Sequence, residues 1–125
     1  MQEDPEERIA ADRMLKRIEE LYGFVPLVNE VLSERPDMFI PAVRLGKAVL
    51  EGKGDLDRRT RYLAAVAAAT AVGGEHCIKV QMEHAIKAGA TKDELMETMM
   101  IGSYMAMTRS QSYAFRRLSE RFPDE

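Results

Sequence analysis

The sequence predicts an all-α fold of about six helices, on the basis of three observations. Helix start signals recur: Asp4 is followed by Pro5, and Thr91 is followed three residues later by Glu94, which is the spacing of a capping box. Between such starts and glycine stops, apolar residues repeat at intervals of three and four. Alternation of apolar and polar residues, which is typical of half-buried strands, reaches no useful length.

The N-terminal part contains two predicted helices. The first has Asp4 as its N-cap, Glu7 placed to complete a capping box, and Gly23 as its stop. A short second helix begins at Pro26. It ends at Arg35, because a residue that precedes a proline avoids the helical conformation.

Glycines and weak periodicity separate the remaining helices. They are predicted at about residues 37–51, from Asp55 or Asp57 to about Val72, at about 75–88, from Thr91 onward, and as a last segment through Tyr113, Phe115 and Leu118. Pro41 must lie in a first turn or break its helix. The segment Leu63–Ala71 is nearly all small and apolar, which predicts a helix buried on all sides. Around residues 108–110 the periodicity weakens, which predicts a break.

Composition limits the class of protein. The 125 residues form one predicted domain, 1–125, and 46% hydrophobic residues suffice for a core. A net charge of −3 without a run of basic residues argues against a nucleic-acid partner. No uncharged stretch is long enough to span a membrane. The acidic start Met1–Asp4 lacks the apolar region of a secretory signal, so a cytoplasmic location is expected. A single cysteine excludes an intrachain disulfide.

The candidate chemistry lies in the helix predicted at 75–88. At 100° per residue, Cys77, Gln81 and His84 lie within about 60° of one another. The core face of this helix is expected to consist of Ile78, Met82, Ala85 and Ile86. Cys77 lies in the first turn, where unpaired N–H groups and the helix dipole favour a thiolate. It is therefore a candidate reactive thiol beside His76; the alternative is a small buried hydrophobe. Neighbouring helical residues point in different directions, so no metal site is expected here.

Two further features have a functional and a structural interpretation. Five methionines fall in the helix that begins at Thr91: Met96, Met99, Met100, Met105 and Met107. They form either a pliable ligand pocket or, as we prefer, filling for the core and a subunit interface. Arg109 follows this helix and is a candidate for holding an anionic substrate at the end of a pocket wall.

Two motifs carry a family resemblance between Leu56 and Phe115. Leu56–Arg61 fits the pattern Leu-Asp-Arg-x-Thr-Arg, and Ala85–Glu94 fits Ala-x-x-x-Gly-x-[Ser/Thr]-x-[Asp/Glu]-Glu. This part of the chain resembles the carboxymuconolactone decarboxylase family, which includes the alkylhydroperoxidase D proteins. The resemblance implies an alkylhydroperoxidase D-like helical fold and a homotrimer or homohexamer with pockets near the subunit interfaces.

The motif of the peroxidase branch is partly retained. That branch has a glutamate on its central helix and then Cys-x-His-Cys-x-x-x-His. Here His76 and Cys77 match, whereas Gly74, Tyr62 and Gln81 stand in place of the first cysteine, the glutamate and the final histidine. A dithiol cycle needs a second thiol, which the chain lacks, so a one-cysteine cycle with an external thiol is the form left open.

The resemblance also leaves the decarboxylase branch open. The motif of that branch has a histidine followed by a glutamate, and then a second histidine. Here His76 matches the first histidine, Cys77 replaces the glutamate and Gln81 replaces the second histidine. His84 is a candidate to act as the base in place of that second histidine. The expected function is thiol-dependent peroxidase or oxidoreductase chemistry with Cys77 and His76 as catalytic residues. Tyr62, Gln81, His84 and Arg109 are expected to line the pocket. The substrate is expected to be a peroxide, a thiol or a small organic acid, with no cofactor. The alternatives are a lactone decarboxylase-like enzyme and a non-catalytic ligand-binding oligomer.

Overall fold

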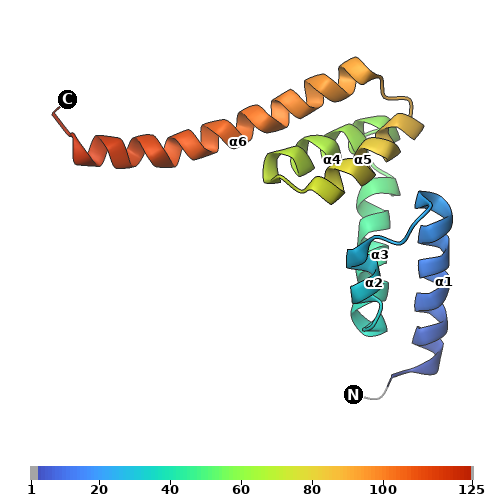
Figure 1. The fold of residues 1–125 in the computed structure, drawn as a ribbon. Coiled ribbons are helices and arrows are strands. Elements are labelled where there is room, and N and C mark those ends of the chain that lie inside the picture. Colours follow the sequence, from blue (N-terminus) through green and yellow to red (C-terminus); the bar gives the residue numbers. More distant parts are fainter. Residues whose placement is uncertain (1–2, 125) are drawn as a thin grey trace. The chain divides into compact units, whose positions relative to one another are not determined.

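The computed structural model describes residues 3–124, and these form six α-helices without a strand. The prediction of an all-α fold with about six helices is confirmed. Met1, Gln2 and Glu125 lie outside the described residues, and with them part of the acidic N-terminus. The helices, shown in Figure 1, are α1 Pro5–Tyr22, α2 Leu27–Leu32, α3 Pro36–Glu51, α4 Arg58–Val72, α5 Glu75–Lys87 and α6 Lys92–Arg121.

The chain divides into two compact units between Gly54 and Asp55. Helices α1 to α3 belong to the first unit and α4 to α6 to the second. The single domain 1–125 stays a prediction, since two compact units can belong to one domain. Within the described part of the chain, no helix combines the length and the apolar character that crossing a membrane requires.

In the first unit, α1 packs against α3 around a small apolar core of Ala11, Phe39 and Ile40. The predicted start and stop of α1 are confirmed. The carboxylate of Asp4 accepts a hydrogen bond from the N–H of Glu6 at 2.9 Å, and Gly23 has a left-handed φ of 81°. No capping box forms at this end, because the Asp4 side chain bonds the second N–H of the helix and not the third.

Helix α3 departs from the expectation for Pro41. This proline is the sixth residue of α3, beyond the first turn, and the helix continues to Glu51. A proline at this depth removes one backbone hydrogen bond from the ladder. The burial of Phe39 and Ile40 against α1, immediately before it, favours the continuous helix.

In the second unit, α4 packs against both α5 and α6. Its buried residues Tyr62, Val66 and Ala69 follow the four- and three-residue spacing of one helix face. Helices α4 and α6 run in the same direction. Arg59 forms an ion pair with Glu94 near the start of both helices, and Gly102 lies against Ala67 further along.

The expectation that Leu63–Ala71 is buried on all sides is wrong. Ala64 and Ala68 are exposed, and Val72 in the same row is 79% exposed. Since α5 and α6 are the helices of this unit that pack on α4, they cover the face of Tyr62 and leave the opposite face open. Small apolar residues on all sides of a helix predict that other helices can pack closely against it. They do not predict how many such helices the same chain provides.

Helix α6 is a single helix of 30 residues, so the predicted break at residues 108–110 is wrong. Its capping box is confirmed: Thr91 Oγ1 accepts from the N–H of Glu94, whose carboxylate accepts from the N–H of Thr91 at 2.9 Å. Thr108 Oγ1 donates to the carbonyl of Met105 at 3.1 Å without interrupting the helix. The weak periodicity reflects the lack of a buried face, since every described residue from Arg109 onward is exposed.

The methionines of α6 do not fill the core of the unit. Met96, Met100, Met105 and Met107 are between 47% and 61% exposed. Only Met99 is half-buried. The core-filling interpretation is therefore wrong for four of the five, and their contribution to a subunit interface stays a prediction.

Stability in acid is expected to depend on the N-cap of α4. Asp57, one of the two candidate caps, accepts a hydrogen bond from the N–H of Thr60 at 2.8 Å. The hydrogen bonds from Thr60 lower the pKa of the Asp57 carboxyl from its ordinary value of 3.8. A carboxyl whose pKa is lower in the folded state stabilises the fold fully above the ordinary value. It loses that contribution as the pH falls through the lowered pKa.

Asp57→Asn should therefore reduce the acid sensitivity of folding. Asparagine retains a side-chain oxygen for the cap but does not titrate. We expect the unfolding free energy to fall less between about pH 5 and pH 3 in this variant than in the unmodified protein, as measured by urea unfolding. The matched control is Asp55→Asn, the other candidate, which caps no helix. If Asp57→Asn and Asp55→Asn changed the pH dependence of the unfolding free energy equally, the assignment of Asp57 as the titrating N-cap of α4 would be contradicted.

Candidate functional site

Cys77 is the third residue of α5, in the first turn, as predicted. Its side chain is exposed, so it is not a small buried hydrophobe in this chain. The turn is closed by a hydrogen bond from the N–H of Ile78 to the carbonyl of Gly74 at 2.8 Å. Gly74, the N-cap, contributes no side chain to the capping of α5. The thiol thus lies among backbone N–H groups at the start of a helix, a setting that favours an anion.

Gly74 leaves open the space beside this thiol. A Cβ atom built on Gly74 would lie 3.5 Å from the Cβ and 3.9 Å from the Sγ of Cys77. In disulfides the Cβ atoms are about 3.5–4.5 Å apart. The position that the resemblance assigns to the first cysteine of a Cys-x-x-Cys pair therefore has the spacing of such a pair. The glycine makes Cys77 a one-thiol site that a small molecule can approach.

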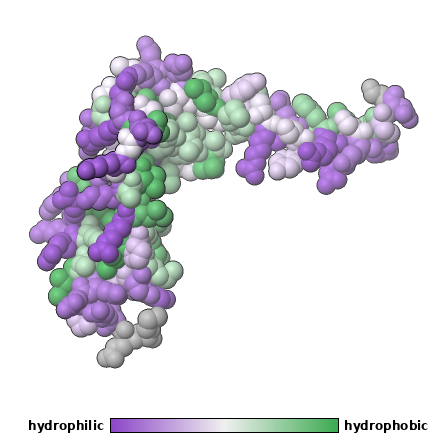
Figure 2. Space-filling view, turned by 180° about the vertical axis from the view of Figure 1, so that it is seen from behind, coloured by the Kyte–Doolittle hydropathy of each residue, from purple (hydrophilic) through white to green (hydrophobic). Residues whose placement is uncertain are grey.

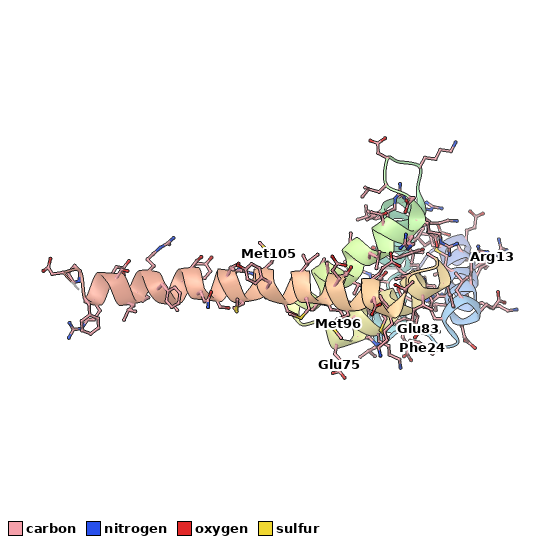
Figure 3. The ribbon with its side chains drawn as sticks, turned by 90° about the horizontal axis from the view of Figure 1, so that it is seen from above. Arg13, Phe24, Glu75, Glu83, Met96 and Met105 are labelled. Atoms are coloured by element: carbon pink, nitrogen blue, oxygen red, sulfur yellow. The ribbon has the colours of Figure 1, made fainter. Side chains whose placement is uncertain are left out.

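His76 and Glu75 share this first turn and are exposed. Figure 3 shows the Glu75 side chain directed away from the helices. The charge of Glu75 opposes an anion at this helix start, whereas an imidazolium at His76 would favour one. The two residues next to the thiol therefore act in opposite directions.

A second group of side chains lies between α4 and α5. The ring of Tyr62, 1% exposed, stacks on the ring of His84 with centroids 5.0 Å apart and planes 15° apart. The guanidinium carbon of Arg58 lies 5.7 Å from the centroid of the Tyr62 ring, within cation–π range. These contacts join two predicted site residues, Tyr62 and His84, and add Arg58.

Gln81 lies on the inner side of α5, one turn from both Cys77 and His84. Its Oε1 atom is buried and has no hydrogen-bond partner among the described residues. A buried carbonyl oxygen without a donor is costly, so this atom is suited to accept a hydrogen bond from a ligand or a water molecule.

The inner face of α5 differs in one residue from the expected core face. Ala85 is buried, and Ile78, Gln81, Met82 and His84 are half-buried. Ile86, which was expected in the core, is 45% exposed. It lies 100° around the helix from Ala85, beyond the face that α4 covers.

The arginines of α4 and α6 have different surroundings. Arg59 pairs with Glu94, and the Nε of Arg61 donates to the carbonyl of Leu56 at 3.0 Å. Arg58 contacts the Tyr62 ring, as the four-residue spacing between the two residues on one helix could have indicated. Arg109 lies exposed on α6, two turns past Gly102, and the structure does not bring it to Tyr62 or His84. Its place in a pocket wall stays a prediction.

The described residues thus define an all-α protein whose candidate polar side chains gather on α4 and α5. Within the described range, no group of three or more His, Cys, Asp or Glu side chains is placed to hold a metal ion. The carboxymuconolactone decarboxylase family matches residues 36–120, from the start of α3 to near the end of α6. The chain belongs to this family. Among curated proteins no significant match is found.

Proposed function

We propose that this protein is a small-molecule enzyme that reduces peroxides with the thiol of Cys77 and an external thiol. One observation carries the proposal: the only cysteine of the chain is exposed in the first turn of α5, beside His76. Membership of the carboxymuconolactone decarboxylase family supports an enzymatic function, because that family includes peroxidases that use a cysteine at this place.

The proposed reaction proceeds in three balanced steps. The Cys77 thiol loses its proton, and the thiolate attacks the terminal oxygen of a hydroperoxide. The O–O bond breaks, the cysteine becomes a sulfenic acid, and the alkoxide leaves as the alcohol by taking up the proton that the thiol lost. A first external thiol attacks this sulfur, forming a mixed disulfide and releasing water. A second external thiol attacks the mixed disulfide, which restores the Cys77 thiol and releases the oxidised disulfide of the reductant.

The neighbouring side chains support substrate binding. Tyr62 and His84 present aromatic surface, and Gln81 Oε1 is a buried acceptor without a partner among the described residues. A hydroperoxide has one O–H group, and Gln81 Oε1 can accept a hydrogen bond from it. In this proposal His76 favours the thiolate, and Tyr62, Gln81 and His84 position the substrate.

Cys77→Ser should abolish thiol-dependent peroxide consumption. The expected loss is complete to the limit of detection, because serine cannot form a sulfenic acid or a disulfide. The measurements are peroxide consumption with a low-molecular-weight thiol and the pH-dependent alkylation rate of Cys77 in the native protein. His76→Gln is expected to slow peroxide consumption and the alkylation of Cys77 without abolishing either reaction. Peroxide consumption that persists in Cys77→Ser, or is absent from the unmodified protein, would refute the proposal.

A second candidate function is a reaction on a small carboxylated substrate, such as a lactone. The contact of Arg58 with Tyr62, whose ring stacks on His84, favours it, because a guanidinium can bind a carboxylate and an imidazole can move a proton. This activity would survive Cys77→Ser and be lost in His84→Gln. A purified protein that acts on neither class of substrate would favour a non-catalytic ligand-binding oligomer.

A further inference from the structure

Three methionines in the first turns of α6 share one face of the helix. Met96, Met99 and Met100 are three and four residues apart, the spacings at which side chains on a helix are neighbours. We call them the thioether cluster. Met96 is 57% and Met100 61% exposed. Met99 is half-buried, because it lies one turn from both Leu95 and Gly102, which are buried. The cluster is therefore open to solvent on one side and held by packing on the other.

The direction of the side chains favours a meeting of the three sulfur atoms. Long side chains on a helix lean toward its N-terminus, so Met99 and Met100 extend over the turn that carries Met96. The Cβ atoms of such neighbours are about 5–6 Å apart. A methionine side chain is unbranched and has three rotatable bonds, with which its sulfur can adjust its position. Three thioethers can thus surround a single small ion.

The charges around the cluster favour a cation. Residues 93–107 include three acidic side chains and no basic one. Glu94 is engaged in an ion pair with α4. Asp93 and Glu97 are exposed, and each precedes a methionine of the cluster by three residues, so their carboxylates lie beside it. Figure 2 shows hydrophilic and hydrophobic residues side by side along α6.

The ligand type determines which cation fits. A thioether sulfur is neutral and soft, and soft sulfur ligands select Cu(I). Zinc in proteins is bound by thiolate, imidazole and carboxylate groups, and calcium and magnesium take oxygen ligands. Three thioethers offer none of these groups. The cluster therefore fits a soft monovalent cation and discriminates against the common divalent ions.

We propose that Met96, Met99 and Met100 form a binding site for Cu(I). Two other methionines of α6 stand apart from it and serve as controls. Met105 lies on the opposite side of the helix from Met96, as Figure 3 shows. Met107 lies seven residues beyond Met100, about 10 Å along the axis at the normal helical rise. The proposal is independent of the proposed function, because no residue of the cluster belongs to the candidate site on α4 and α5.

The test uses the full chain with Cys77→Ser, because a free thiolate binds Cu(I) itself. The probes are Cu(I) under anaerobic reducing conditions and Ag(I), a soft ion of the same charge. The readout is the NMR spectrum of protein whose methionine methyl groups carry ¹³C. We expect the methyl signals of the three cluster methionines to shift together on addition of either ion. The signals of Met105 and Met107 should stay in place, and Zn(II) should shift none of the five.

Met96→Leu and Met100→Leu, each in the Cys77→Ser protein, test the ligands directly. Leucine keeps the helix propensity and nearly the volume of methionine, so the fold should be retained. Each variant should weaken Cu(I) binding by roughly tenfold or more, in competition with a chromogenic Cu(I) chelator, since even the loss of an outer partner of a metal ligand has such an effect. The matched control, Met105→Leu, is equally exposed in the unmodified chain and should bind Cu(I) as the Cys77→Ser protein does.

Three results would overturn the proposed site. The first is a Cys77→Ser protein that binds neither Cu(I) nor Ag(I), which would assign any Cu(I) binding of the unmodified chain to the thiol. The second is a loss of binding in Met105→Leu equal to that in Met96→Leu. The third is a shift of the cluster signals by Zn(II), which would indicate binding by carboxylates. None of these results bears on peroxide reduction by Cys77, so the two proposals fail separately.

Discussion

Gly102→Ala is expected to destabilise the second unit by about 1–3 kcal/mol, the usual cost of overpacking a close contact. Gly102 is buried where α6 crosses α4. A Cβ atom at this position would overlap the backbone oxygen of Ala67 and approach the Cβ of Thr70 to 3.1 Å. Neither atom is the end of a flexible side chain, so α6 would have to move away from α4.

The matched control is Gly46→Ala in α3. A Cβ at Gly46 meets nothing within 4 Å, and its φ is not positive. Alanine there should stabilise α3 by about 0.5–1 kcal/mol through its higher helix propensity. Urea unfolding of both variants measures the two effects. If Gly102→Ala were as stable as Gly46→Ala, the close packing of α4 and α6 would be refuted.

The sequence predicted the helix ends well because the signals that set them are local. Asp57 caps α4, Thr91 and Glu94 form the capping box of α6, and Gly23 takes the left-handed conformation that a helix stop requires. Each of these depends on residues within one turn.

The errors concern properties that depend on what covers a helix. The break at residues 108–110 was inferred from fading periodicity, but periodicity records a buried face and not the continuity of the backbone. The same reason explains the open side of α4 at Ala64 and Val72. A pattern of apolar residues identifies a surface to be buried without saying whether the same chain buries it.

The candidate site shows the same limit. The common face of Cys77, Gln81 and His84 followed from the spacing on one helix. The stacking of Tyr62 on His84 could not be predicted in this way, because it joins two helices and depends on their packing. Tyr62 stands where the resemblance expects a glutamate, and its ring stacks on the imidazole of His84.

Gly74→Cys is expected to convert the one-thiol site into a dithiol site. A Cβ atom at Gly74 would lie 4.0 Å from the backbone oxygen of Ala69, an ordinary van der Waals contact, and Gly74 has an ordinary negative φ of −80°. Its Cβ would lie 3.5 Å from that of Cys77, within the range for a disulfide. Under a mild oxidant, the variant should lose both free thiols together and regain them on reduction.

This substitution should also change the kinetics of the proposed peroxidase. In the unmodified protein, the sulfenic acid of Cys77 waits for an external thiol, so its resolution should depend on the concentration of that thiol. In Gly74→Cys the resolving thiol is held beside it, and well-oriented groups react as if at very high local concentration. Resolution should therefore become independent of the external thiol, as stopped-flow peroxide reduction followed by thiol titration can measure.

The control for Gly74→Cys is Ala64→Cys, which adds a thiol at an exposed position two turns before the end of α4. It should form no intrachain disulfide and keep the dependence on external thiol. If Gly74→Cys formed the disulfide but consumed no peroxide, the geometry would hold and the peroxidase proposal would fail. If no disulfide formed while both thiols stayed accessible to alkylation, the first turn of α5 would differ from the one described here. These separate outcomes test the position of Cys77 and its chemistry independently.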